Sequence, residues 1–236
     1  MQAKEAGWYD EFYKQVQTRM APWYQFLMPD LLPELRSDSR LIELGCGQGH
    51  ILRLLTGHSP ILEENIYGID QSAVAVEFTR GLLPKAHIST QDIYQMDFPR
   101  DHFDVCLLME TIEHLEAPVL ALQKIREVIA PGGILYASFP NYLSLPWLPV
   151  RILAEKLNTP WSRNWVVLQP VDKIYTTFHV RKLAAAAGFT FEKGIGSGYG
   201  PPVLYRAEKE WMTKSLNALG LWHLSFHPVL KFRKPV

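Results

Sequence analysis

The chain is poor in cysteine, has no excess of charge of either sign and has no long apolar run. Its 236 residues include only two cysteines, Cys46 and Cys106, too few for a disulfide-stabilised scaffold. Both lie in apolar segments that we expect to be partly buried as reduced thiols. Lysine plus arginine equals aspartate plus glutamate, at 24 each, so no basic surface for nucleic acid or an anionic membrane is predicted.

A membrane span and a leader are also missing from the pattern. No run of about 18 apolar residues occurs, and Met1 to Gly7 lack the apolar core of a signal peptide. We therefore expect a soluble, cytoplasmic protein. A hydrophobic content of 47% in a chain of this length is enough for one core, so a single domain is predicted.

The sequence does contain an apolar, strand-like segment followed at once by three alternate glycines. Leu41 to Leu44 suits a buried parallel strand, and Gly45, Gly47 and Gly49 precede a helical pattern from His50. Glycine there allows a sharp turn and the close approach of a ligand. The free N–H groups of the following helix point to the same place. The stretch predicts a ligand-binding crevice at the carboxyl end of this strand.

The spacing of these glycines differs from that of dinucleotide-binding proteins. Their fingerprint is G-x-G-x-x-G, whereas here the third glycine comes one residue early and an acid precedes the first. The segment resembles the first motif, E-x-G-x-G-x-G, of class I S-adenosylmethionine-dependent methyltransferases. The resemblance implies S-adenosylmethionine as the cofactor and S-adenosylhomocysteine as its product. It also implies that the cofactor contacts Glu43, Gly45, Cys46, Gly47 and Gly49.

Further acids follow the next two predicted strands. Asp70 ends the strand expected at 65–70, roughly 20 to 25 residues past the glycine turn, where an acid can bind both ribose hydroxyls. Gln71 lies beside it, and a plain helix cap is the alternative for the acid. After the strand expected at 86–90, the resemblance implies that Asp92 meets the adenine amino group while Ile93 packs on the ring. A solvated loop acid is the alternative for Asp92.

The fourth strand is expected at 102–109 and ends in Met109 and Glu110, which we expect to contact the cofactor. The segment from Glu110 to Leu115 resembles the E-x-x-E-H-L of small-molecule O-methyltransferases of the ubiquinone-biosynthesis type. Histidine ordinarily titrates near neutral pH, so His114 is the candidate general base, with Glu113 as a second catalytic residue. A histidine that only packs or caps a helix is the alternative.

A metal site is a further alternative for this segment. If it is helical, Glu110, Glu113 and His114 fall at i, i+3 and i+4 and share a face that could hold a hard divalent ion. A similar cluster with one more histidine does so in small-RNA 2′-O-methyltransferases. The later segment offers only His179, which is out of register and is expected at a helix N-terminus. We therefore predict no metal ligands.

The order of elements predicts an α/β fold: a Rossmann-like, seven-stranded, mostly parallel sheet with helices on both faces and an antiparallel last strand. A break at Pro131 to Gly133, a hallmark of the resembling family, is expected between a helix at 118–129 and a strand at 134–139. We assign residues 1–38 to a helical cap, 39–140 to the cofactor-binding core, 141–178 to a substrate lid and 179–236 to a C-terminal helix and strands.

Two of these segments admit more than one interpretation. The cap carries Trp8, Tyr9, Phe12 and Tyr13 at helical spacing, and these either close over the cofactor or only pack on the sheet. The basic residues of the tail, Lys231, Arg233 and Lys234, are expected at a solvated strand end rather than an anion site.

These features together predict a methyltransferase that acts on a small molecule, most often at oxygen. The aromatic residues of the lid either favour an apolar or aromatic acceptor or form the core of the lid itself. An N- or C-methyltransferase and a non-catalytic cofactor-binding module of the same fold are the alternatives. Without a basic face or an N-P-P-Y-type motif, nucleic acid is not the expected substrate.

Overall fold

The structure is a computed structural model that describes residues 2–15, 24–141, 144, 147–157, 170–200 and 209–236. The helices are α1 (Gln2–Gln15), α2 (Tyr24–Leu31), α3 (His50–His58), α4 (Ala73–Leu82), α5 (Pro118–Val128), α6 (Leu148–Leu157), α8 (Thr177–Ala186) and α9 (Glu210–Ala218). The strands are β1 (Leu41–Leu44), β2 (Ile66–Asp70), β3 (His87–Thr90), β4 (Phe103–Leu108), β5 (Ile129–Ser138), β6 (Thr190–Ile195) and β7 (Val229–Arg233). Short 3-10 turns, among them η3 (Ile93–Gln95), η4 (Ile112–His114) and η6 (Leu221–Leu224), join them.

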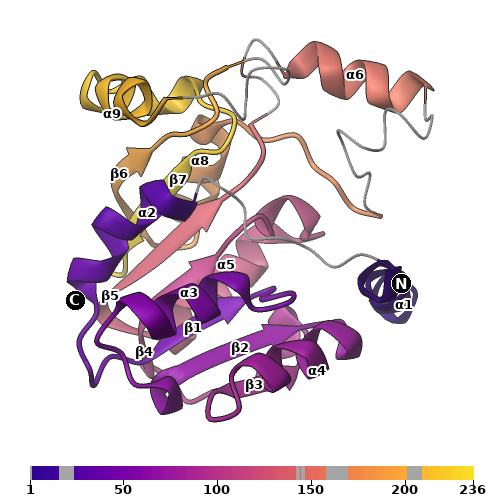
Figure 1. Ribbon diagram of the computed structural model, residues 1–236, viewed down its shortest axis with the longest axis vertical. Helices are drawn as coiled ribbons and strands as arrows, with labels where there is room; N and C mark the ends of the chain where they lie inside the picture. The colour runs from indigo at the N-terminus through magenta and orange to yellow at the C-terminus, as the bar shows by residue number, and fades with distance from the viewer. Residues whose placement is uncertain (1, 16–23, 142–143, 145–146, 158–169, 201–208) are drawn as a thin grey trace.

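The described residues form one seven-stranded sheet in the order β3-β2-β1-β4-β5-β7-β6 (Figure 1). The first five strands pair in parallel, and β7 runs antiparallel to both β5 and β6. The order reverses beside β1, whose neighbours are β2 and β4. Open α/β sheets bind ligands at the carboxyl ends of the strands at such a reversal. The predicted Rossmann-like sheet with an antiparallel last strand is therefore confirmed.

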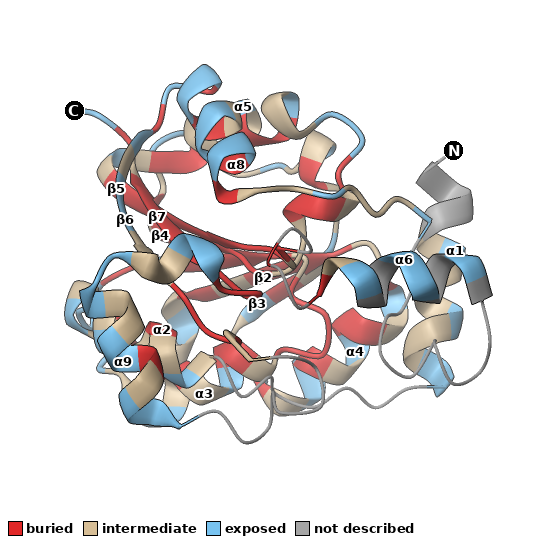
Figure 2. Cartoon of the chain, turned by 90° about the horizontal axis from the view of Figure 1, so that it is seen from above, coloured by how far each residue is buried: buried red, intermediate tan, exposed pale blue. Residues whose placement is uncertain are grey.

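Helices cover both faces of the sheet (Figure 2). One apolar cluster packs α5 and α8 on one face, and a second packs α2, α3 and α4 on the other. Strand alternation divides β1 between them: Ile42 and Leu44 join the first cluster and Leu41 joins the second. Burial on both faces explains why the sequence of this strand is almost wholly apolar.

Several expectations about local structure were wrong. Strand β5 begins at Ile129, so Pro131 to Gly133 lies within the strand, which accommodates it by a register shift against β4 between Phe103 and Val105. The residues after β4 form only the 3-10 turn Ile112–His114 and not a helix.

The basic tail also differs from expectation. Lys231 is 6% exposed and contacts Asp30, Glu34 and Glu192, while Lys234 is 9% exposed and donates to Asp101 and to two backbone carbonyls. These lysines are buried ion pairs that fasten β7 to α2 and to the end of α5. A buried charge is tolerated only when it is paired, so neither lysine is part of a solvated strand end.

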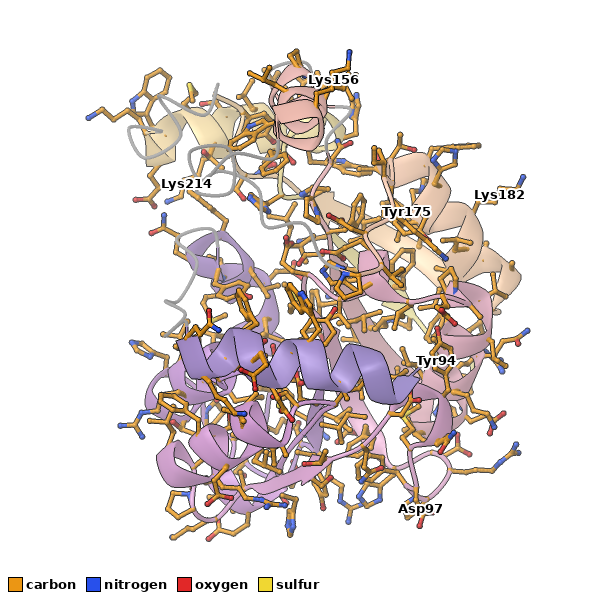
Figure 3. The ribbon with its side chains drawn as sticks, turned by 90° about the vertical axis from the view of Figure 1, so that its right-hand side faces the viewer. Tyr94, Asp97, Lys156, Tyr175, Lys182 and Lys214 are labelled. Atoms are coloured by element: carbon orange, nitrogen blue, oxygen red, sulfur yellow. The ribbon has the colours of Figure 1, made fainter. Side chains whose placement is uncertain are left out.

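Helix α1 lies apart from the layers, beyond the carboxyl ends of β1 and β2 (Figure 1). Seen from that side, it crosses the front of the molecule (Figure 3). Asp10 joins it to α4, because its carboxylate accepts from the Ser72 hydroxyl at 2.6 Å and from the Val74 N–H at 3.3 Å. Among the described residues, no helix has the length and apolarity needed to span a membrane.

Candidate functional site

The glycine turn is built from backbone hydrogen bonds between β1 and β2. The N–H groups of Gly45 and Cys46 both donate to the Ile69 carbonyl, at 2.8 and 3.0 Å, and the Gly49 N–H donates to the Cys46 carbonyl at 2.9 Å. Gly45, Gly47 and Gly49 all have positive φ, of 75°, 50° and 69°. Residues other than glycine adopt this backbone conformation only under strain, so the three predicted glycines are needed for the turn itself.

Glu43 lies beneath this turn in an unusual state. It is 4% exposed, and Oε2 has no hydrogen-bond partner among the described residues. Burial first, and then the charge of Asp70, raise the pKa of its carboxyl well above the ordinary value. An unpartnered buried oxygen beside a backbone cradle is a place for a donor group of a ligand. Cys46 is buried here too, as a free thiol.

Asp70 closes the turn from the end of β2. Its Oδ2 accepts from the Gly47 N–H at 2.8 Å and its Oδ1 from the Ser72 N–H at 2.9 Å. Burial raises the pKa of the carboxyl, while the bonds from Ser72, Gly47 and Gln71 work in the opposite direction. Ser72 is also the N-cap of α4, with its hydroxyl accepting from the Ala75 N–H at 3.2 Å. Asp70 therefore fixes the turn as well as facing the cavity.

A cavity runs from the glycine turn to the residues after β4, with α1 as its outer wall. Its lining consists of Trp8, Tyr9, Phe12 and Tyr13 of α1, of Gly45, Ile69, Asp70, Gln71, Gln91 and Ile93 at one end, and of Glu110, Thr111, His114, Leu115, Pro170 and Val171 at the other. The aromatic residues of the first segment thus face the site. Tyr13 reaches the turn: a Cβ on Gly47 would lie 2.7 Å from its hydroxyl.

The predicted adenine-binding pair divides in the structure. Ile93 lines the cavity, whereas the Asp92 carboxylate accepts from the Tyr94 N–H at 3.0 Å as the cap of η3 and is not among the lining residues. Gln91, which the sequence analysis did not single out, lines the cavity instead. Met109 is 4% exposed and lies in the core beside the site.

Glu113 and His114 form a contact at the far end. The Val171 carbonyl lies 2.7 Å from Nδ1 of His114, and because a carbonyl can only accept, that nitrogen carries the proton. Nε2 then presents its lone pair, 3.5 Å from Oε1 of Glu113. Glu113 is 1% exposed, and burial followed by the charge of Glu110 raises its pKa well above the ordinary value. Burial therefore favours the neutral form of Glu113.

Residues 170–175, which we call the strap, hold this end in place. Besides the His114 contact, the Lys173 N–H donates to the Glu113 carbonyl at 2.9 Å, and its ammonium donates to the Glu116 carbonyl at 2.6 Å. The strap belongs to the predicted lid, of which residues 142–143, 145–146 and 158–169, with Trp161 and Trp165 among them, lie outside the described residues. Trp147 is buried and stacks on Phe226 with ring centroids 3.9 Å apart, so this lid tryptophan belongs to internal packing.

Glu110 does not share a helix face with Glu113 and His114. Its backbone has a positive φ of 49°, and its carboxylate turns to Ser138 and His227 instead. Within the described residues, no group of three or more histidine, cysteine, aspartate or glutamate side chains could hold a metal ion. His179 follows the N-cap Thr176 of α8, which accepts from the His179 N–H. The contacts of Asp10, Tyr13 and His227 had no signal in the sequence beyond the aromatic spacing of α1.

The geometry fits S-adenosylmethionine on two observations. The first is that any added Cβ would fill the glycine cradle. Cβ atoms on Gly45, Gly47 and Gly49 would lie 2.5 to 2.7 Å from neighbouring side-chain atoms. Glu43 and Asp70 add acceptors at the same end for amino or hydroxyl groups.

Comparisons with known proteins agree with this site. A profile of the family described as methyltransferase domain matches residues 12–193, well over half of the chain. A ubiquinone biosynthesis O-methyltransferase of Bradyrhizobium sp. (strain ORS 278) is 31% identical over 109 residues, which are 44% of this chain and 41% of the relative. One from Glaesserella parasuis is 25% identical over 190 residues, 75% of each chain. The chain thus spans less than half the length of the Bradyrhizobium relative.

Solved structures show the same fold at low identity. A possible histamine N-methyltransferase of Thermotoga maritima has a TM-score of 0.65 and 17% identity, covering 99% of this chain and 100% of that one. A geranyl diphosphate methyltransferase in complex with S-adenosylmethionine has a TM-score of 0.63 and 12% identity, covering 89% and 84%. With the match over residues 12–193, the chain belongs to the methyltransferase domain family, among the class I enzymes whose cofactor is S-adenosylmethionine.

Proposed function

We propose that the protein transfers a methyl group from S-adenosylmethionine to an oxygen of a small apolar or aromatic molecule. The observation that carries the proposal is that one cavity joins the glycine turn to His114, which contacts the buried Glu113, beneath an aromatic wall. The ubiquinone biosynthesis relatives are O-methyltransferases by name, which favours oxygen over nitrogen or carbon.

The roles of the residues at the first end follow from their chemistry. Gly45, Gly47 and Gly49 give the cofactor access to the backbone, with Cys46 between them. Glu43 and Asp70 offer oxygens to its amino and hydroxyl groups. Ile93, beside the lining residues Gln71 and Gln91, offers an apolar surface to the adenine ring of the cofactor. Asp92 and Met109, each next to a lining residue in the chain, remain predicted contacts.

At the other end, the residues hold the acceptor and receive its proton. S-adenosylmethionine supplies an electrophilic methyl group, whose bond to sulfur breaks as the acceptor oxygen attacks. Alignment of the reacting atoms contributes most of the rate, and the aromatic wall of α1 and the strap would restrict the acceptor. His114 keeps Nδ1 on the Val171 carbonyl and takes the acceptor's proton on Nε2, while Glu113 retains its own proton nearby.

Cofactor binding is the first test. Calorimetry is expected to show that S-adenosylmethionine and S-adenosylhomocysteine bind and that NAD does not. Asp70→Ala is expected to weaken S-adenosylmethionine binding by about 1 to 3 kcal/mol, because hydroxyl groups lose a charged partner and the Gly47 N–H loses its acceptor. An unchanged affinity would refute the ribose assignment.

Turnover is the second test. Release of S-adenosylhomocysteine is measured with phenols, catechols and amines of similar size as acceptors. His114→Asn keeps a donor for the Val171 carbonyl and removes the base, so turnover should fall about a hundredfold with cofactor affinity nearly intact. His58→Asn, on the exposed end of α3, is the matched control. Methylation confined to amines would contradict the assignment to oxygen, and full turnover in His114→Asn would exclude this base.

A further inference from the structure

A second acid–imidazole contact lies on the opposite side of the end of β4. Nδ1 of His227 is 3.3 Å from Oε2 of Glu110, although 117 residues separate the two in the sequence. His227 is 6% exposed and does not line the cavity, whereas Glu110 does. The two groups are close enough for an electrostatic contact, although Nδ1 makes no hydrogen bond to the carboxylate.

The backbone of Glu110 is strained in a way that directs its side chain. Glu110 and Asp101 are the residues other than glycine with positive φ in the described part of the chain. This conformation persists only where neighbours determine it, and such residues cluster at functional sites. Here the neighbour that determines the conformation is Ser138. The Glu110 N–H donates to the Ser138 carbonyl at 3.2 Å and to the Ser138 hydroxyl at 3.0 Å. This hydroxyl in turn donates to Oε1 of Glu110 at 2.7 Å.

His227 is itself held rigidly. Its N–H donates to the Ser197 carbonyl at 3.0 Å, and its carbonyl accepts from the Ser197 N–H at 3.2 Å. The ring packs edge-on against Phe226 with centroids 4.4 Å apart, and Phe226 stacks on Trp147. One oxygen of the Glu110 carboxylate is therefore hydrogen-bonded to a serine, and the other lies against a buried imidazole.

The charges around Glu110 leave it as the anion that faces this end of the cavity. Burial and the charge of Glu110 raise the pKa of Glu113 and so favour its neutral form. Tyr24 of α2 lies close enough to interact with the charge of Glu110. Burial raises the pKa of the Tyr24 hydroxyl well above its ordinary value, which disfavours its ionisation. Among the described residues, no lysine or arginine lines the cavity. A carboxylate exposed to the cavity and countered only by neutral or weakly basic groups attracts a cationic ligand.

We propose that His227 is a positioning residue that holds Glu110 toward the cavity, where its carboxylate favours the positively charged sulfonium of S-adenosylmethionine over the neutral sulfur of S-adenosylhomocysteine. The inference rests on the proposed function in that this cofactor occupies the cavity. It adds a role for a residue on the approach to β7, outside every predicted motif. Such a preference would help a spent cofactor to leave after transfer.

The test compares the affinities of the two cofactor forms by calorimetry at low salt, without any acceptor. Glu110→Gln should lower the ratio of S-adenosylmethionine to S-adenosylhomocysteine affinity by about fivefold or more, because the carboxylate charge is lost. His227→Asn places an amide donor where Nδ1 lies and should keep the wild-type ratio. His227→Gln moves the donor to the Nε2 position and should lower the ratio nearly as far as Glu110→Gln.

Controls separate this role from a merely structural one. His223→Gln, on exposed η6, should leave the ratio unchanged. Both His227 variants are polar and of similar size, so thermal melting should find them folded alike. Equal ratios in the Asn and Gln variants, or an equal weakening of both cofactor forms, would overturn the proposal. Failure of the wild-type protein to bind S-adenosylmethionine would instead overturn the proposed function.

Discussion

The two ends of the cavity are built in different ways. At the glycine turn, the contacts link residues of one β-α-β unit and use backbone atoms, as when Asp70 accepts from Gly47 and Ser72. At the end of β4, side chains from distant segments meet: Glu110 with His227, and His114 with Val171 of the strap. The first end can form from local chain geometry, whereas the second requires the far strands and the strap to be in place. Mutations at the two ends should therefore fail in different ways.

The largest effect is expected from breaking the local end. At Gly49, φ is 69° and an added Cβ would lie 2.5 Å from Cγ2 of Thr79. Gly49→Ala should weaken S-adenosylmethionine binding at least tenfold in calorimetry, because left-handed backbone alone costs an alanine about 1 to 2 kcal/mol.

A glycine inside α3, the helix that follows Gly49, is a matched control. It shows whether the loss of affinity depends on the position of the glycine or only on replacing a glycine. Nothing lies within 4 Å of a Cβ added to Gly57 of α3. Gly57→Ala should leave cofactor affinity unchanged and raise the free energy of unfolding by up to about 1 kcal/mol. Wild-type affinity in Gly49→Ala would show that the turn tolerates a side chain and that the local end is not preformed by its glycines.

The distant end should be distinguished by the pH dependence of stability. Burial raises the pKa of Glu113 above its ordinary 4.5, so above that pH the folded protein keeps a proton that the unfolded chain has lost. The contribution of this group is fully present below about pH 4.5 and is lost as pH rises toward the raised value, at about 1.4 kcal/mol per pH unit. Glu113→Gln, which mimics the protonated acid, should flatten that slope.

Urea unfolding followed by tryptophan fluorescence from pH 5 to pH 7.5 measures this slope. Glu43 and Asp70, whose pKa values are also raised by burial, contribute to it and remain in the variant. The slope should therefore decrease by the share of one proton and not vanish. Glu116→Gln, exposed three residues later, should behave as wild type. An undiminished slope in Glu113→Gln would mean that Glu113 is ionised in the folded protein.

The same division explains how far the sequence could predict the site. Glu43, the three glycines and Asp70 belong to one β-α-β unit whose spacing reflects local backbone geometry, and all except the half-buried Gly45 are buried. The contact of Glu110 with His227 depends on how β7 inserts between β5 and β6, which no local pattern encodes. Helical spacing for Glu110, Glu113 and His114 failed because Glu110 takes a left-handed conformation fixed by Ser138. The prediction of a solvated Lys231 was wrong because its partners Asp30 and Glu192 lie on α2 and β6, which no local pattern brings together.

The smallest effect is expected where the two ends meet, at α1. Asp10 bonds to Ser72 and to the Val74 N–H at the start of α4, where a carboxylate also interacts favourably with the helix dipole. Asp10→Ala should release α1 from α4, at a cost of about 1 kcal/mol. Hydrogen exchange of the α1 amides should then speed up severalfold, and cofactor affinity should fall less than in Gly49→Ala, because the turn itself remains intact.

Glu11 offers a neighbour of the same charge on the same helix, bonded only to exposed Lys14. Glu11→Ala should leave exchange of α1 nearly unchanged, so any difference between the variants reports the Asp10 contact and not the loss of a charge. If both variants exchange at the wild-type rate, the aromatic residues Trp8, Phe12 and Tyr13 hold α1 without Asp10. The wall of the cavity would then belong to the glycine-turn end, through Tyr13 against Gly47, and not to a separate junction between the two ends.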